Sequence, residues 1–167
     1  TPKDETANSK FIEGKIDGLN GSIGNQPFIF NQSNIEVKTI RPISYGIDFY
    51  GDSLFTSEMQ IKENPEQAEK FREATLRGWY YAMANVEEIV DLIIGEYAPG
   101  SAREHLQFEA EALQRLILPD LIDIGHVSPR RIERIAQIYS DLGLVPANYS
   151  LEGFLYNPTE GDGYDFR

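Results

Sequence analysis

The chain has 167 residues, 41% of them hydrophobic, which is enough for one globular domain with a sizeable core. Its 27 acidic and 15 basic residues give a net charge of −12, which repels phosphate groups, so we expect no nucleic-acid partner. The lack of cysteine excludes disulfides, thiolate metal sites and a cysteine nucleophile, and the only two histidines, His105 and His126, suggest no metal site.

The sequence of the first third of the chain predicts short helices and strands in alternation. Turn residues separate a helix that Gly14 ends, a glycine-containing strand, a helix opened by Pro27 and a strand of cleanly alternating polarity. These elements are predicted at residues 11–14, 16–22, 27–32 and 35–40.

Residues 45–57 combine aromatic rings, carboxylates and glycines between this part and a helical part. Ile47 and Phe49 alternate with Asp48 and Tyr50, which predicts a short half-buried strand with its apolar side inward. Tyrosine offers a flat amphipathic surface and carboxylates accept hydrogen bonds, so the segment suits a ligand. The alternative interpretation is an aromatic strand and turn that fill a core.

From residue 58 onward the hydrophobic period becomes 3.6, which predicts about four or five α-helices. One helix is expected from Pro65 to about Ala84, and a second ends near Gly95. Ser101 with Glu104 resembles a capping box for a third. Pro129 and Gly143 delimit a fourth. The expected fold class is therefore α/β, with short strands confined to the first third.

Several segments, in order, resemble one family of proteins over about residues 11–157. The family comprises periplasmic substrate-binding-like (type II) domains grouped with fungal thiamine-pyrimidine synthases and with nitrate, taurine and alkanesulfonate binding proteins. The C-terminal pattern is most similar to the ligand-sensing ectodomains of bacterial histidine kinases and diguanylate cyclases. The resemblance rests on Glu13-Gly14-Lys15-Ile16-Asp17-Gly18, Gly24-Asn25-Gln26-Pro27-Phe28, residues 45–57, Asn64-Pro65-Glu66, residues 77–82, residues 118–126 and residues 151–156.

The resemblance implies part of a type II fold of two α/β lobes. Residues 1–44 would belong to the second lobe, residues 45–157 would hold the crossover and the mainly helical end of the first lobe, and residues 158–167 would form a flexible tail. It further implies a periplasmic location, a parent protein anchored in the inner membrane, and a missing N-terminal part of the same domain as a partner. Exposed apolar helix faces would then favour a homo-oligomer.

The resemblance also implies a non-catalytic solute-sensing domain. By motif position, the contacts would be Asn25 and Gln26 as hydrogen-bonding groups, Tyr45 and Tyr50 as walls, and Asp48 and Asp52 as acceptors. The ligand would be pyrimidine-, sulfonate- or amino-acid-like, although Gln26 replaces a glutamate common in relatives.

Three alternatives to a solute sensor remain open. One is a transporter-associated substrate-binding protein, and another is a helical protein-interaction module. The third is an enzyme of the thiamine-pyrimidine precursor pathway, for which Asp48, Asp52 and His126 would be the acid–base set. The cysteine-rich motif of the pyridoxal-phosphate-dependent fungal enzymes is absent, so we expect neither a cofactor nor catalysis.

Overall fold

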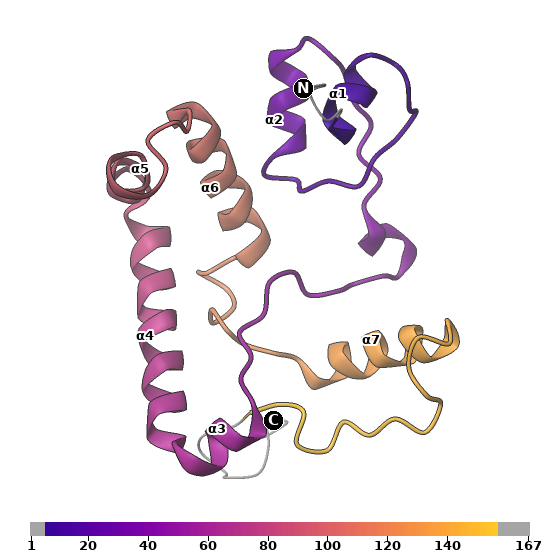
Figure 1. The fold of residues 1–167 in the computed structure, drawn as a ribbon, viewed down its shortest axis with the longest axis vertical. Coiled ribbons are helices and arrows are strands. Elements are labelled where there is room, and N and C mark those ends of the chain that lie inside the picture. Colours follow the sequence, from indigo (N-terminus) through magenta and orange to yellow (C-terminus); the bar gives the residue numbers. More distant parts are fainter. Residues whose placement is uncertain (1–5, 157–167) are drawn as a thin grey trace, which may run out of the picture. The chain divides into compact units, whose positions relative to one another are not determined.

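The computed structural model describes residues 6–156, and every regular element in that range is a helix (Figure 1). In chain order these are α1 (Ala7–Ile12), α2 (Gln26–Gln32), the 3-10 helix η1 (Pro42–Tyr45), α3 (Glu58–Glu63), α4 (Pro65–Ala84), α5 (Val86–Leu92), the π-helical turn η2 (Ile93–Tyr97), α6 (Arg103–Ile117) and α7 (Pro129–Asp141).

The predicted α/β fold class is wrong, because residues 6–156 contain no β-strand. Residues 16–22 and 35–40 follow irregular paths, and residues 47–50 do the same directly after η1. Alternating polarity shows only that one side of a segment prefers to be buried. A strand also needs a neighbour for its backbone N–H and C=O groups, and none of these segments pairs with another within the described range.

Several helix boundaries follow the local signals in the sequence. Gly14 follows α1 with φ of +69°, and Pro27 lies in the first turn of α2. Helix α4 begins at Pro65 and ends at Ala84, and Gly143 lies just beyond the end of α7 with φ of +70°. The predicted capping box at Ser101 is wrong: α6 begins after Ala102, and no side chain caps it.

The described chain divides into two compact units. Unit 1 comprises the described residues up to Thr39 together with Gly78–Ile124, and unit 2 comprises Ile40–Arg77 with the described residues from Gly125 onward. The division at Gly78 falls inside α4, so this helix contributes residues to both units. The boundaries of these units differ from those of the predicted parts, residues 1–44 and 45–157, and the assignment of those parts to two lobes stays a prediction. The predicted tail, residues 158–167, lies outside the described residues.

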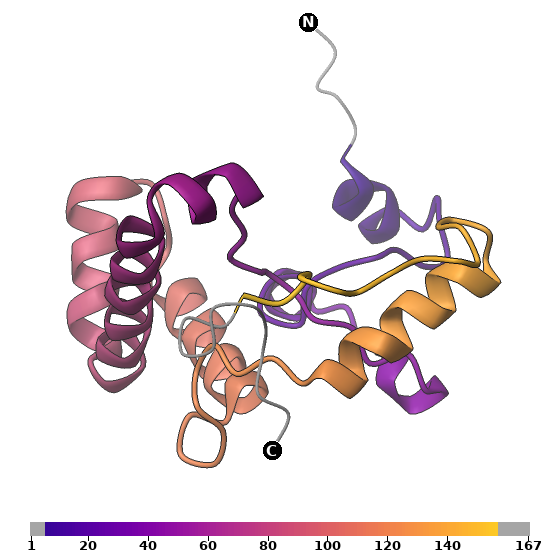
Figure 2. The ribbon, with the colours of Figure 1, turned by 90° about the horizontal axis from the view of Figure 1, so that it is seen from below.

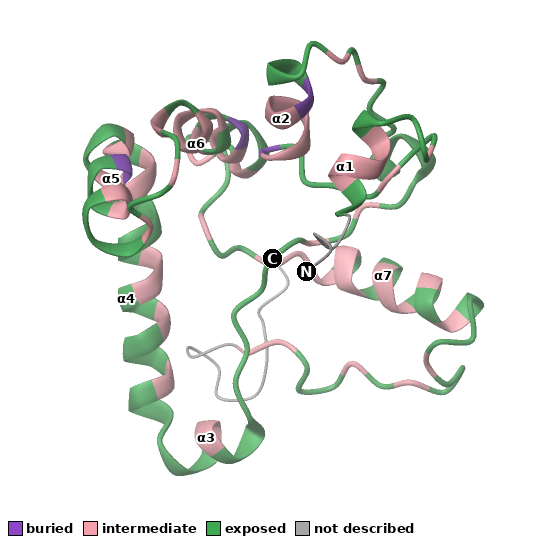
Figure 3. Cartoon of the chain, turned by 45° about the horizontal axis from the view of Figure 1, so that its top comes forward, coloured by how far each residue is buried: buried purple, intermediate pink, exposed green. Residues whose placement is uncertain are grey.

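Unit 1 contains all the buried hydrophobic side chains of the described chain, which lie on α2, α5 and α6 (Figure 3). They are Phe30, Val90 and Ala112, at 3%, 2% and 8% exposure. The ring of Phe11 on α1 packs against Phe30 with centroids 4.8 Å apart. This contact joins α1 to α2, and Phe28 of α2 packs on His105 and Phe108 of α6.

Polar contacts join α5 and the end of α4 to α6. The Arg103 guanidinium at the start of α6 pairs with Glu87 at 3.2 Å and with Asp91 of α5. Near the other end, the Gln114 side-chain amide donates to the Met83 carbonyl at 2.9 Å. Helix α6 is thereby held along its length in unit 1.

Unit 2 has no buried residue among those described. The segment leading from η1 to α3 passes the N-terminal end of α7 (Figure 2) and contacts it through Asp48 and Tyr50. No helix within residues 6–156 has the length and apolar character needed to cross a membrane.

Candidate functional site

The N-terminal end of α7 and the segment that follows η1 form a cluster of polar contacts in unit 2. The Arg131 guanidinium pairs with the Asp48 carboxylate at 2.8 Å, and it lies over the Tyr50 ring at 4.6 Å from the centroid. The Tyr50 hydroxyl accepts a hydrogen bond of 2.8 Å from the Ser128 N–H. We call Asp48, Tyr50, Ser128 and Arg131 the α7 cluster.

The α7 cluster places a cation, an anion and an aromatic face side by side and within reach of solvent. The side chains of Asp48 and Arg131 remain 41% and 38% exposed, so each keeps hydrogen-bonding capacity beyond the pair. Such an arrangement can bind a small molecule that carries both an acidic group and an amino group.

The apolar and polar sides of residues 47–50 are reversed relative to the prediction. Ile47 and Phe49 are exposed, whereas Asp48 and Tyr50 are half-buried against α7. The reason is that Arg131 and the Ser128 N–H supply partners for the two polar side chains. Phe49 instead stacks on Tyr139 of α7, with centroids 5.5 Å apart.

The other two candidates in unit 2, Tyr45 and Asp52, do not join this cluster. Tyr45 ends η1 and is 73% exposed. Asp52 is exposed and makes no hydrogen bond or ion pair with any described residue. The structure therefore brings together Asp48 and Tyr50 of the predicted set in unit 2.

Asn25 and Gln26 lie at the start of α2 in unit 1, and Gln26 is already engaged locally. Its side-chain oxygen accepts a hydrogen bond of 2.7 Å from the Ser22 N–H. Gly21 permits this approach, since a β-carbon there would lie 2.8 Å from the Gln26 side chain. Asn25 precedes the helix and makes no side-chain capping bond. Gln26 thus stabilises the turn through its side-chain oxygen, which a ligand would have to share.

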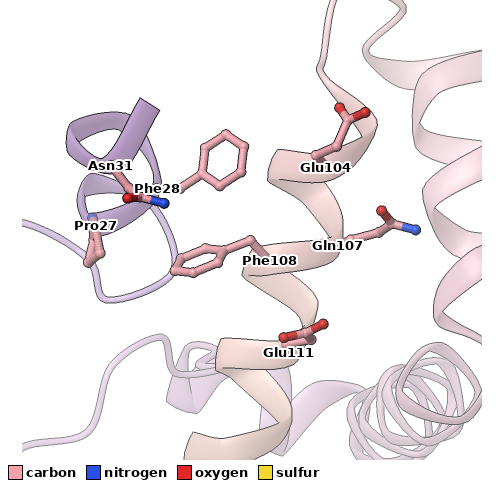
Figure 4. Close-up of a pocket in the computed structure, with 7 residues that line it drawn as sticks. All are labelled: Pro27, Phe28, Asn31, Glu104, Gln107, Phe108 and Glu111. Atoms are coloured by element: carbon pink, nitrogen blue, oxygen red, sulfur yellow. The ribbon is translucent and has the colours of Figure 1, made fainter. Parts of the chain in front are cut away.

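A cavity of about 530 Å³ lies between α2 and α6 of unit 1 (Figure 4). The rings of Phe28 and Phe108 lie side by side along it, with centroids 5.5 Å apart and planes inclined by 46° (Figure 4). Neither Asn25 nor Gln26 lines it, although both precede its first residue directly. The lining residues are Pro27, Phe28, Asn31, Glu104, Gln107, Phe108 and Glu111.

One tyrosine has a displaced pKa, and it lies outside these sites. The Tyr81 hydroxyl donates a 2.7 Å hydrogen bond to the Glu88 carboxylate, which raises the pKa of the Tyr81 phenol, and desolvation and the charge of Glu88 act in the same direction. Within residues 6–156 no group of three or more carboxylate or imidazole side chains is arranged to hold a metal ion.

The sequence interpretation missed Arg131, the residue that links the α7 cluster. A signal was present: Arg130 and Arg131 lie in the first turn of a helix, where the backbone dipole favours acidic side chains. A cation in this turn that is partly buried is stabilised by a carboxylate from elsewhere in the chain. That Asp48 supplies it was not evident from local pattern.

Comparison with known proteins identifies the family. The sequence profile described as NMT1/THI5-like matches residues 3–89, just over half of the chain and a range that holds all six candidate residues. The chain therefore belongs to this family of periplasmic-binding-protein type II domains, as the motifs predicted. Its members mostly bind substrates, and they are typically extracytoplasmic. No curated protein and no solved structure matches the chain.

Proposed function

We propose that the chain is a non-catalytic, extracytoplasmic solute-sensing domain of a membrane-anchored bacterial signalling protein. The observation that supports it is the family match, because NMT1/THI5-like domains mostly bind small molecules and the match covers Asn25, Gln26 and residues 45–52. The signalling role rests on the resemblance of residues 118–126 and 151–156 to sensor ectodomains.

The chemistry of the α7 cluster narrows the ligand class. Arg131 can bind a carboxylate or sulfonate in a two-pronged geometry, Asp48 can accept hydrogen bonds from an ammonium group, and the Tyr50 ring offers a flat wall. A sulfonate or amino-acid-like molecule with an amino group satisfies all three. It would displace part of the existing ion pair rather than fill an empty charged site.

The test is a thermal unfolding screen of the chain against pyrimidines, sulfonates, nitrate and amino acids. A ligand at about 100 times its dissociation constant should add roughly 2.7 kcal/mol of stability. For a chain of this size that is a rise in Tm of roughly 5 to 10 °C. If no compound raises the Tm of the wild-type chain, the solute-binding proposal is wrong.

Two variants test the assignment to the α7 cluster. Arg131→Met should abolish the shift of a responding compound, and Arg130→Met, which removes a neighbouring exposed arginine, should retain it. Each shift is measured from the variant's own Tm. Equal shifts in both variants would leave solute binding intact and exclude Arg131 as the contact.

A helical interaction module is the second candidate function, and exposed apolar side chains favour it. Phe55, Met59 and Phe71, in and around α3 and α4 of unit 2, are 91%, 64% and 62% exposed. Such a surface is typical of protein contacts. This function predicts an apparent mass that rises with protein concentration in light scattering, together with no response to the ligand panel.

A further inference from the structure

The cavity between α2 and α6 combines an aromatic wall of two phenylalanine rings with an acidic rim. Phe28 and Phe108, whose rings contact each other, form the aromatic part of the lining, and the carboxylates of Glu104 and Glu111 lie on α6 at the edge (Figure 4). No lysine, arginine or histidine is among the described residues that line it. The lining therefore favours a positively charged ligand over a neutral or anionic one.

The two carboxylates differ in how far they are already neutralised. Glu111 pairs with Arg115 one turn further along α6, at 3.0 Å. Glu104 makes no hydrogen bond or ion pair with any residue of the described range, and the neighbouring Arg103 pairs with Glu87 and Asp91 instead. Glu104 is thus the carboxylate with full capacity for a ligand.

The aromatic wall is held in place before any ligand arrives. The Phe28 ring stacks on His105 with centroids 4.6 Å apart and planes inclined by 6°. The Phe108 ring also contacts the Phe28 ring, with the two planes inclined by 46°. Aromatic faces attract cations, and preorganised rings lose little conformational entropy on binding.

We propose that this cavity binds an organic cation in which an ammonium group is attached to an aromatic or other apolar moiety. The ammonium group contacts Glu104, and the apolar moiety packs against Phe28 and Phe108. The volume of about 530 Å³ lies within the range usual for small-molecule sites. The site belongs to unit 1 and shares no residue with the α7 cluster.

Three probes with the same phenyl body isolate the contribution of charge: phenethylammonium, 2-phenylethanol and phenylacetate. Binding is followed by chemical-shift changes of backbone amides in ¹H–¹⁵N spectra of the full chain. Phenethylammonium should bind about fivefold more tightly than the alcohol, and phenylacetate most weakly of the three. The largest shifts should fall on α2 and α6.

Two variants with the same change in net charge complete the test. Glu104→Gln should weaken phenethylammonium about fivefold and leave 2-phenylethanol unchanged. Glu96→Gln, on the exposed π-helical turn η2, should change neither. Equal affinity for the ammonium and the alcohol would overturn the proposal. Equal loss of phenethylammonium affinity in both variants would also overturn it, because the loss would then come from the change in net charge and not from a contact with Glu104.

Discussion

The ion pair between Asp48 and Arg131 can be tested by a double-mutant cycle. Asp48→Asn removes one charge with little change in shape. Arg131→Met removes the guanidinium but keeps much of the apolar stem. Because Arg131 also lies over the Tyr50 ring, the arginine variant loses two interactions and the aspartate variant loses one.

The expected magnitudes follow from exposure. Both side chains of the pair are more than a third exposed, so solvent screens the attraction, and we expect a coupling free energy of about 0.5 kcal/mol. The contact of Arg131 with Tyr50 adds about 0.5 to 1 kcal/mol. Asp48→Asn should therefore lower the free energy of unfolding by about 0.5 kcal/mol, and Arg131→Met by about 1 to 1.5 kcal/mol.

The free energies are obtained from urea unfolding of the wild type, the two single variants and the double variant, with Arg130→Met as the matched control. At about 1 M salt the coupling should fall towards zero, because the Debye length shrinks to about 3 Å. Strictly additive single effects at low salt would refute the pair as an energetic contact. An equal loss from Arg130→Met would show that any arginine of this turn has the same effect.

Two further predictions concern unit 1. Phe30→Ala should lower the free energy of unfolding by roughly 3 kcal/mol, because the ring is 3% exposed and packs on Phe11. The control Phe55→Ala, at a side chain that is 91% exposed, should change it by less than about 0.5 kcal/mol. Similar losses for the two variants in urea unfolding would contradict the assigned core. Subtracting the alkaline absorbance titration of Tyr81→Phe from that of the wild type should give a midpoint above the ordinary pKa of 10.0. Since the pKa of Tyr81 is raised in the folded state, its bond to Glu88 stabilises the fold fully below pH 10.0, and this stabilisation is lost as the pH rises through the folded-state pKa. A titration midpoint at or below 10.0 would argue against that bond.

Local signals predicted helix boundaries better than they predicted strands. Pro65 and Gly143 mark limits that depend on a few neighbouring residues, such as a missing N–H or a left-handed backbone, and the structure has them where expected. Residues 16–22 and 35–40 show the opposite case. Their alternating polarity is real, but strand formation depends on a partner that local pattern does not reveal.

In the candidate site, too, local sequence signals predicted some features and missed others. Asp48 and Tyr50 were singled out by residue type, and the structure gives both of them partners on α7. Tyr45 and Asp52, chosen on the same grounds, are exposed and make no hydrogen bond, ion pair or ring contact with the described residues of that cluster. Residue chemistry thus selected the right segment, while the choice among its members needed the position of Arg131.

The sequence by itself determined the family, the acidic character and several helix limits, such as those of α4, because motifs, charge and local backbone signals are properties of the chain and its near neighbours. Only the tertiary structure decided which side of residues 47–50 turns inward and which cation Asp48 meets. Tyr50 and Ser128 lie 78 residues apart, and their contact depends on how the intervening helices close that loop. Long-range pairing of this kind leaves no periodic trace in the sequence, so the contact became visible only in the folded chain.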